Sequence, residues 1–388
     1  MVPNGWKKGV IEDIAKVSSG GTPSRQNDSY WLGGQIPWVT TTEVQFGVIK
    51  GTEQKITEAG LKNSSAKLFP KDTILMAMYG QGKTRGQVAK LGIEASTNQA
   101  CAALLLNDGF EVDYYYQYLV SQYENIRELA NSGGQQNLSA GIIKSIHVPI
   151  PPQLEQRKIA KILSTWDKAI STTERLIDNS TQQKKALMQQ LLTGKKRLLD
   201  DSGKPFEGEW EEFHLVDIAS IKKGKALSAK NVISGEYPVI AGGKTSPYSH
   251  NEYTHENIVT VSASGAYAGF VSHHECKIWA SDCSVVTEKK GNCLLFIFQL
   301  LKLNQNKIYS MQSGGAQPHI YPKDLQVLKV KKPNLDEQQK IASVLTNADQ
   351  EIELLEQQLA DLKQEKKALM QQLLTGKRRV KVDDKEVA

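Results

Sequence analysis

Two stretches of the sequence carry residue types that could perform chemistry. Residues 77–84 read Ala-Met-Tyr-Gly-Gln-Gly-Lys-Thr and nearly match the phosphate-binding loop G-x-x-x-x-G-K-[ST]. Alanine replaces the first glycine, which helps the backbone amides turn around the phosphates. The second stretch could offer metal ligands, namely His273, His274, Cys276, Cys283 and Cys293. It contains no C-x-x-C pair and its spacings match no usual zinc site, so we expect no metal site and buried structural cysteines.

Motifs for other chemistry are missing from the sequence. There is no G-x-S-x-G, no H-E-x-x-H and no convincing cluster of nuclease carboxylates. The Asp/Asn-Pro-Pro-aromatic motif with which adenine methyltransferases hold a flipped base is also absent, since Pro151-Pro152 is followed by Gln153. We therefore expect a chain that is not itself a catalyst. A nucleotide-dependent enzyme that uses Gly82-Lys83-Thr84 is the alternative.

Basic, amide and aromatic side chains on glycine-rich loops suit a different task, the reading of a nucleic acid. Lysines hold phosphates, whereas amides and guanidinium groups make bidentate contacts with base edges. The candidate DNA-contacting residues are Lys83, Thr84, Arg85, Gln135, Gln136, Asn137, Lys222, Lys223, Lys225, Lys244, Tyr248, His250, Tyr267, Gln317 and His319. Each residue alone is also typical of a solvated surface, so the prediction rests on the whole set.

These loops belong to two globular blocks that we expect to be α+β. Short β-like runs, such as 36–41, 73–78 and 102–106 in the first block, are broken by Gly, Pro and Asn. The second block has similar runs at 257–262 and 284–287. Helices are expected at 114–130 and 294–303. Outside a few short stretches the two blocks share little sequence.

The segments between the blocks are repeated. Residues 184–198 return at 366–380 with thirteen of fifteen positions identical, at an offset of 182. The same offset relates residues 155–160 to residues 337–342. Trp6 corresponds to Trp210 at a larger offset of 204. Two different blocks joined to two nearly identical segments indicate two blocks with different tasks and two segments with the same task.

Both repeated segments are predicted to be long amphipathic helices that follow prolines and end at Gly194 and Gly376. Apolar residues recur at alternating spacings of four and three, which is a heptad seam. The seam and docking residues are Ile159, Leu163, Trp166, Ile170, Leu187 and Leu191 in the first copy, Ile341, Leu345, Ile352, Leu355, Leu359, Leu369 and Leu373 in the second, and the outward-facing Gln189, Gln190, Gln371 and Gln372.

We expect the two seams to pair in an antiparallel coiled coil around a pseudo-two-fold axis. The alternative is that each helix packs on its own block. Lys184 and Lys366 interrupt the two seams at equivalent places. Such polar residues fix the register of a coiled coil, or else extend toward solvent near a frayed end. The duplicated outward glutamines suggest two copies of one partner, docked equivalently.

Composition agrees with this organisation. The chain has 388 residues, a formal net charge of +6, 39% hydrophobic and 23% charged residues, and four cysteines. It can therefore bury cores, and its charge permits a nucleic-acid partner. No apolar run approaches the length of a membrane span. We expect a cytoplasmic protein with reduced thiols.

The order of motifs resembles the specificity subunit of type I restriction–modification systems. The resemblance rests on the proline-rich helix entry, the E-Q-x-K-I-A stretch, the long helix and the L-L-T-G-K stop, all present twice. Residues 30–39 (Tyr-Trp-Leu-Gly-Gly-Gln-Ile-Pro-Trp-Val) and the stretches 246–248 and 264–269 look like parts of the target-recognition domains of that family.

The resemblance implies a division into four parts. Residues 1–150 and 205–332 would be target-recognition domains that each read one half of a split, asymmetric DNA site. Residues 151–198 and 333–380 would be helices that set the distance between the half-sites. Two methyltransferase subunits would dock and supply S-adenosylmethionine and adenine-N6 chemistry, and two restriction subunits could add Mg- and ATP-dependent translocation and cleavage. A coiled-coil scaffold with no DNA role is the remaining alternative.

Overall fold

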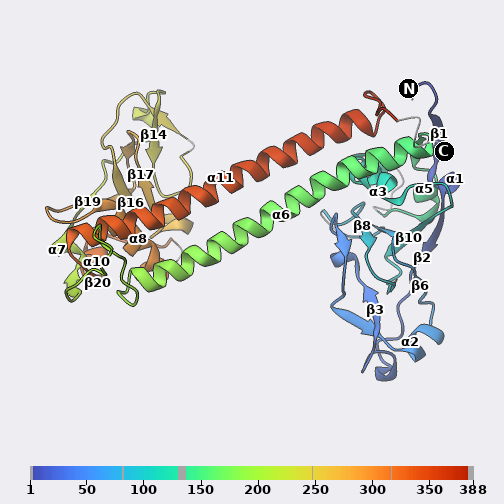
Figure 1. The fold of residues 1–388 in the computed structure, drawn as a ribbon, viewed down its shortest axis with the longest axis horizontal. Helices are drawn as coiled ribbons and strands as arrows, with labels where there is room; N and C mark the ends of the chain where they lie inside the picture. Colours follow the sequence, from blue (N-terminus) through green and yellow to red (C-terminus); the bar gives the residue numbers. More distant parts are fainter. Residues whose placement is uncertain (1–2, 81–82, 130–136, 247, 316, 383–388) are drawn as a thin grey trace. The chain divides into compact units, whose positions relative to one another are not determined.

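The chain forms two compact units. The computed structural model describes all residues except 1–2, 81–82, 130–136, 247, 316 and 383–388. The first unit comprises Met1–Thr173 with Gln358–Ala388, and the second comprises Glu174–Gln357. Each unit therefore contains one globular block and one half of each long helix (Figure 1).

The block of the first unit is α+β, as expected. Its strands are β1 (Lys7–Val10), β2 (Ala15–Ser19), β3 (Ile36–Val39), β4 (Val48–Ile49), β5 (Gln54–Ile56), β6 (Leu68–Phe69), β7 (Ile74–Ala77), β8 (Val88–Leu91), β9 (Ala95–Thr97), β10 (Cys101–Leu106) and β11 (His147–Ile150). Its helices are α1 (Ile11–Ile14), η1 (Asp28–Tyr30), η2 (Thr41–Glu43), α2 (Glu58–Lys62), α3 (Val112–Ser121), α4 (Tyr123–Leu129) and α5 (Ala140–Lys144).

These strands form three sheets. A five-stranded sheet has the order β2-β10-β7-β8-β4, and a four-stranded sheet has the order β5-β3-β9-β6. The central strand β7 is buried at every position, which explains its continuous apolar run Ile-Leu-Met-Ala. The third sheet pairs β1 with β11, so the N-terminal strand is tied to the strand that immediately precedes the long helix.

The block of the second unit repeats this plan with fewer strands. Its strands are β12 (Glu211–His214), β13 (Ala219–Lys223), β14 (Tyr237–Ile240), β15 (Ser249–His250), β16 (Ile258–Ser262), β17 (Val271–His274), β18 (Trp279–Ala280), β19 (Cys283–Glu288) and β20 (Lys329–Lys332). Its helices are α7 (Leu215–Ile218), η3 (Ala229–Asn231), η4 (Gly265–Tyr267), α8 (Leu294–Leu303), α9 (Gln305–Ser310) and α10 (Pro322–Gln326). The sheet orders are β13-β19-β16-β17, β15-β14-β18 and β12-β20.

The predicted long helices are present and have equal length. α6 (Gln153–Leu191) and α11 (Leu335–Leu373) each contain 39 residues. Both begin after prolines, and both are followed by a glycine with positive φ, Gly194 at 71° and Gly376 at 69°. Only glycine adopts this conformation readily, so these residues end the helices where the sequence predicts.

The helix seams pack both on each other and on the blocks, so the two packing alternatives are not exclusive. In the first unit Ile159 and Leu163 of α6 share one core with Leu373 of α11 and with β- and α-elements of the block. In the second unit Leu191 of α6 shares a core with Ile341 and Leu345 of α11 in the same way. Within each unit, therefore, the opening turns of one helix meet the closing turns of the other.

The direction of pairing is antiparallel in each unit. In the first unit Glu155 contacts Arg379 and Asp167 contacts Lys366, so residue numbers rise along α6 as they fall along the segment of α11 and its tail. In the second unit Lys184 of α6 contacts Asp349 and Ser180 contacts Glu351. The seam residues between these contacts, such as Ile177 and Ile352, are half-buried, which is typical of an isolated helix pair.

Candidate nucleic-acid interface and helix junctions

In the first unit, one end of the five-stranded sheet carries the loops that the sequence predicts to contact DNA. β2 and β7 end there and β10, antiparallel to both, begins there. The turn between β7 and β8 holds Lys83, which is exposed, and Thr84, which is half-buried. The backbone N–H of Leu138 donates to the carbonyl oxygen of Met78 at 3.0 Å, so the exposed Asn137 lies beside the same turn. Gln135 and Gln136 lie outside the described residues.

One expectation about this turn, and one alternative to the expected function, are wrong. Arg85 is only 9% exposed, so its side chain packs into the block and is not an exposed DNA contact. The phosphate-loop alternative also fails, because the turn leads into the antiparallel strand β8. A phosphate-binding loop needs a following helix whose N-terminal amides face the phosphate.

The second unit brings four candidates from three loops together at the corresponding sheet end. The turn after β16 contains Tyr267, which is 43% exposed. The backbone N–H of Gly265 donates to the carbonyl oxygen of Pro318 at 3.1 Å, which holds this turn against the loop of Gln317 and His319. The ammonium of Lys244 lies 5.2 Å from the ring centroid of Tyr267. Lysine, tyrosine and amide groups from three separate loops thus share one surface.

The remaining candidates of the second unit divide into exposed and buried residues. Lys222 and Lys223 are exposed at the end of β13, which by its pairing with β19 is the same sheet end. Lys225 follows, with its ammonium 4.8 Å from the ring centroid of Trp279. Tyr248 is 63% exposed. These positions agree with a contact surface.

His250 is a wrong prediction. Its side chain is 4% exposed, lies edge-on against Trp279 and accepts a hydrogen bond from the backbone N–H of Ile233 at 3.1 Å. It therefore holds the β14–β15 region together and does not present a group to a ligand. Sequence alone could not separate it from the exposed Tyr248 two positions earlier.

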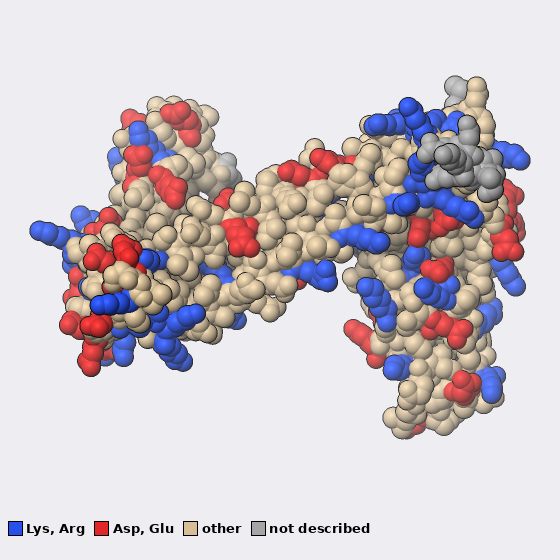
Figure 2. Space-filling view, viewed as in Figure 1, with Lys and Arg blue, Asp and Glu red and all other residues tan. Residues whose placement is uncertain are grey.

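Charge is distributed over both units without a single-sign face in the view of Figure 2, where Lys and Arg alternate with Asp and Glu. This agrees with the modest formal charge of +6. On this face, binding of a polyanion would depend on individual cations at defined positions.

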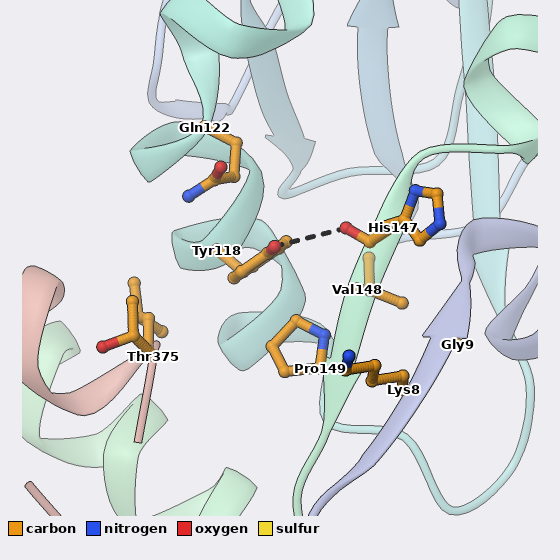
Figure 3. Close-up of a pocket in the computed structure, with 9 residues that line it drawn as sticks. Lys8, Gly9, Tyr118, Gln122, His147, Val148, Pro149 and Thr375 are labelled. Carbon is orange, nitrogen blue, oxygen red and sulfur yellow. Dashed lines mark hydrogen bonds between the residues drawn. The ribbon is translucent and has the colours of Figure 1, made fainter. Parts of the chain in front are cut away.

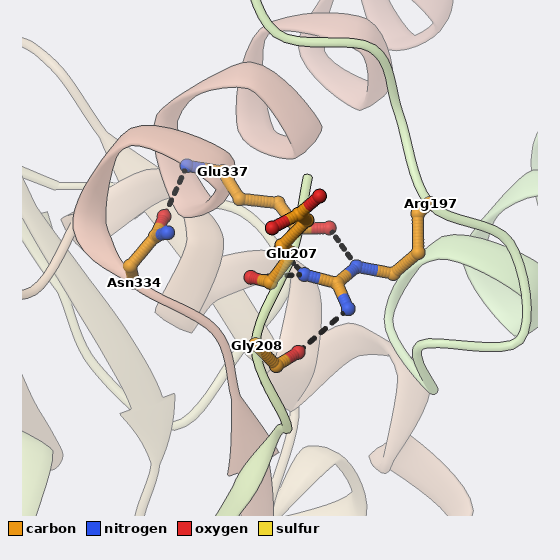
Figure 4. Close-up of polar contacts among 5 residues, drawn as sticks. All are labelled: Arg197, Glu207, Gly208, Asn334 and Glu337. Carbon is orange, nitrogen blue, oxygen red and sulfur yellow. Dashed lines mark hydrogen bonds and ion pairs between the residues drawn. The ribbon is translucent and has the colours of Figure 1, made fainter. Parts of the chain in front are cut away.

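The helix junction of the second unit is built around a buried carboxylate. Glu337 at the start of α11 is fully buried and accepts two hydrogen bonds from Arg197, from Nε and Nη2 at 2.6 Å each (Figure 4). Arg197 Nη1 also donates to the carbonyl oxygen of Gly208 at 2.8 Å. The hydrogen bonds that Arg197 donates to Glu337 raise the pKa of the Arg197 guanidinium. This bidentate pair attaches the tail of α6 to the first turn of α11.

The first unit contains the same junction. Glu155 at the start of α6 accepts from Arg379, which follows α11, and Arg379 Nη1 donates to the carbonyl oxygen of Asn4 at 2.7 Å. The indole of Trp6 adds a third bond to this carboxylate at 3.3 Å. A glutamine after each glutamate, Gln156 and Gln338, accepts a backbone N–H from the block. The segment that follows each long helix therefore binds the first turn of the other long helix.

A second polar contact occurs further along each seam. In the second unit Asp349 of α11 contacts Lys184 of α6 and accepts from Gln299 Nε2 of α8 at 2.9 Å. In the first unit Asp167 of α6 likewise contacts Lys366 of α11 and accepts a hydrogen bond from Gln117 Nε2 of α3. The side chains of Lys184 and Lys366 are only 11% and 14% exposed, so they do not extend to solvent from a frayed end. Each network ties both helices to one helix of the block.

The outward glutamines lie where the heptad places them. Gln189, Gln190, Gln371 and Gln372 are exposed, whereas Leu187 and Leu369 on the seam are half-buried. Trp166 and Ile170 are also half-buried. The duplicated surface of the two helices is thus free in the part of the chain that the structure describes.

One cavity accompanies the junction of the first unit. It has a volume of about 360 Å³ and lies between β1, β11, α3 and the end of α11, where Tyr118 Oη donates to the carbonyl oxygen of His147 at 3.2 Å (Figure 3). Burial raises the pKa of Tyr118, so the phenol stays protonated. Lys8, His147 and Thr375 also line the cavity, which lies between the end of α11 and the block.

The expectation of buried structural cysteines is met only in part, since Cys101 and Cys283 are buried, Cys293 is half-buried and Cys276 is exposed. Among the described residues, no three His, Cys, Asp or Glu side chains come close enough to share a metal ion. Burial raises the pKa of Cys101 and of Cys283 to about 12, so both thiols stay protonated and unreactive. Over the same described ranges, no helix is long and apolar enough to cross a bilayer.

Several important residues were missed by the sequence analysis. They are the junction residues Glu155, Arg197, Glu337 and Arg379 and the network residues Gln117, Asp167, Gln299 and Asp349. A signal for them existed, because every pair obeys the offset of 182 that relates the repeated segments. Applied to polar positions inside the otherwise divergent blocks, the offset would have identified Gln117 and Gln299.

Comparison with known proteins agrees with this architecture. The family model described as type I restriction modification DNA specificity domain matches residues 3–179 and again 207–364. The MjaVIII specificity subunit of Methanocaldococcus jannaschii, a type I restriction enzyme subunit, is 25% identical over 98% of this chain and 94% of its own length. The MjaIX specificity subunit of the same organism is 28% identical, over 60% of this chain and about half (55%) of its own length.

Solved structures share the fold. The crystal structure of the type I restriction–modification system S subunit from M. genitalium covers 96% of both chains with a TM-score of 0.71 at 19% identity. A chain from a structural study of complex assembly and conformational transition of the type I system covers 96% of this chain and 98% of its own length, with a TM-score of 0.56 at 15% identity.

Proposed function

Because the chain belongs to the type I restriction–modification DNA specificity family, we propose that it reads a bipartite, asymmetric DNA site on behalf of catalytic partner subunits. One observation carries the proposal. The two helix junctions repeat residue by residue, as with Glu155–Arg379 and Glu337–Arg197, whereas the loops at the two sheet ends differ. Constant supports that present different loops are suited to reading two different sequences.

In this proposal each block reads one half-site with the loops at its sheet end. Residues 1–150 and 205–332 are the target-recognition domains, and residues 151–198 and 333–380 are the spacer helices. Lys83, Thr84 and Asn137 serve the first domain. Lys222, Lys223, Lys225, Lys244, Tyr248, Tyr267, Gln317 and His319 serve the second. Backbone contacts by lysines would set the register on the duplex, and amide groups would contact base edges.

The partners follow from the duplicated surface. Gln189 and Gln190 are exposed on one helix, and Gln371 and Gln372 are exposed at equivalent places on the other. We propose that two methyltransferase subunits dock there equivalently, and that two restriction subunits could join them. S-adenosylmethionine, ATP and Mg would be held by these partners in the cytoplasm, and this chain would contribute no catalytic residue.

An exchange of domains tests the proposal. Residues 1–150 are replaced by the corresponding block of another specificity subunit, and methylated adenines are mapped by sequencing in cells that carry the methyltransferase. We expect one half of the methylated site to change while the other half stays. The matched control exchanges residues 205–332 and should change the other half. Changes in both halves, or in neither, would contradict the proposal.

A further inference from the structure

A cluster of three lysines lies where the second block meets the helices. Lys302 is at the end of α8, Lys184 is on α6, and Lys244 is on the loop that follows β14. The ammonium groups of Lys244 and Lys302 each lie 5.4 Å from the ring centroid of Phe270. One aromatic ring therefore has a cation from each of two separate elements near it.

Negative charge does not balance this cluster. Asp349 already forms an ion pair with Lys184 and accepts a hydrogen bond from Gln299. Among the described residues neither Lys244 nor Lys302 has a carboxylate within ion-pair distance, and their contacts are with the rings of Tyr267 and Phe270. Three lysines and one aspartate leave a local charge of about +2. Burial, helped by Lys184 and Lys244 and opposed by Asp349, lowers the pKa of Lys302.

The first unit shows that this charge is not part of the shared framework. At the offset of 182, Lys184 corresponds to Lys366 and Asp349 corresponds to Asp167, a neutral pair. The residue that corresponds to Lys302 is Val120. The helix junction therefore folds without the additional cation. A half-buried lysine without a carboxylate at ion-pair distance costs stability, so its presence in one unit alone favours a ligand that supplies further negative charge.

The geometry around the cluster decides the kind of ligand. The cavity between the Lys244 loop, Phe270 and the sheet face at Thr260 and His274 has a volume of only about 20 Å³, close to the space of one water. No base or nucleotide fits into it. A ligand therefore meets these cations from outside this cavity, on the side where Lys244 lies 5.2 Å from the ring centroid of the exposed Tyr267.

We infer that Lys244 and Lys302, supported by Lys184, bind consecutive phosphates of the DNA backbone at the inner edge of the second recognition domain. The inference rests on the proposed function and assigns it a phosphate contact that the first domain lacks. Phosphate contacts set the position of a protein on the duplex and do not select bases.

The test measures how the DNA affinity of the assembled complex depends on salt. The full chain with its methyltransferase subunits is titrated with a duplex containing the mapped site, at several salt concentrations. Each phosphate contact contributes about 0.9 to the slope of log K against log salt. We expect Lys244→Gln and Lys302→Met each to bring the slope about one nearer to zero, and the double variant about two.

Matched variants separate this effect from general loss of charge or of fold. Lys290→Gln removes one exposed lysine before α8, at the opposite end of a helix of ten residues, and should leave the slope unchanged. Lys302→Arg and Lys244→Arg keep the charge and should keep the slope. Discrimination against single base changes in the half-site should be the same in all variants.

The outcomes are distinct. A double variant with the slope of the native complex overturns the inference and leaves the proposed function standing. The same holds if base discrimination changes while the slope does not, because the lysines would then read bases. A native complex that binds the mapped site no better than unrelated DNA overturns the proposed function and the inference together.

Discussion

Glu337 and Arg197 show at the level of single residues how much the helix junction depends on one ion pair. The carboxylate is fully buried, so removal of its partner leaves an uncompensated charge. Loss of one partner of such a pair typically costs about 3–5 kcal/mol. We expect Arg197→Met to lower the free energy of unfolding of the second unit by about that amount, measured by urea denaturation. Arg197→Met with Glu337→Met should cost less than Arg197→Met alone.

An exposed ion pair on the same helix provides the control. Lys340 contacts Asp201 at 2.7 Å, and the aspartate side chain is completely exposed. Such pairs contribute about 0–1 kcal/mol. Lys340→Gln should therefore change the urea midpoint little. If Arg197→Met behaves like Lys340→Gln, the junction is not held by this carboxylate.

His274 makes a pH-dependent contribution to the stability of the sheet in the second unit. Burial, with the neighbouring His273, lowers its pKa from 6.5 to about 4. The unfolded chain then binds the proton more tightly than the folded chain between these values, so stability falls as pH falls from 6.5 toward 4. We expect the NMR titration of this ring to have its midpoint well below 6, and His274→Asn to flatten the dependence of the urea midpoint on pH. A midpoint near 6.5 would show that the ring is solvated.

At the level of elements, the helices could be predicted and the junctions could not. Heptad spacing, prolines before each helix and glycines after it are local signals, and α8 was predicted with its exact bounds Leu294–Leu303. The contacts Gln117–Asp167 and Gln299–Asp349 join segments that are 50 residues apart. Such contacts depend on tertiary packing, and helical periodicity in the sequence does not predict which distant segments pack together. The burial of Arg85 and His250 was hidden for the same reason.

The glycine that ends α6 should be sensitive for two reasons that can be separated. Gly194 has φ of 71°, and a Cβ atom there would lie 3.2 Å from Cδ2 of Trp210. Gly203 has a similar φ of 81° with nothing within 4 Å. Gly203→Ala should cost only the left-handed backbone penalty of about 1–2 kcal/mol. Gly194→Ala should cost clearly more in the same urea measurement, and equal losses would mean that the tryptophan contact is unimportant.

At the level of the whole molecule, the sequence predicted the organisation better than the individual contact residues. Repetition alone indicated two blocks and two helices, and the family model matches the chain twice, over residues 3–179 and 207–364. Of the candidate DNA contacts, the structure exposes residues such as Lys83 and Tyr248 and buries Arg85 and His250. In the proposed function, loop residues differ with the DNA sequence that each block reads, so no repeated pattern marks them. The polar contacts at the helix junctions repeat because the same two helices pack on a block in both units.

The proposed spacer role makes the last prediction. Seven residues inserted after Arg175 and seven after Gln357, positions related by the offset of 182, keep the heptad phase and the contacts of both junctions. Each helix gains about 10 Å at 1.5 Å per residue, which corresponds to roughly three base pairs at 3.4 Å each. Adenine-methylation sequencing should then show both half-sites unchanged and the unspecified spacer about three base pairs longer. Insertion in one helix only makes the two helices differ in length by seven residues, so their contacts cannot both be kept. This variant should abolish specific methylation. A methylated site with its original spacer in the double insertion would mean that the helices do not set the distance between half-sites.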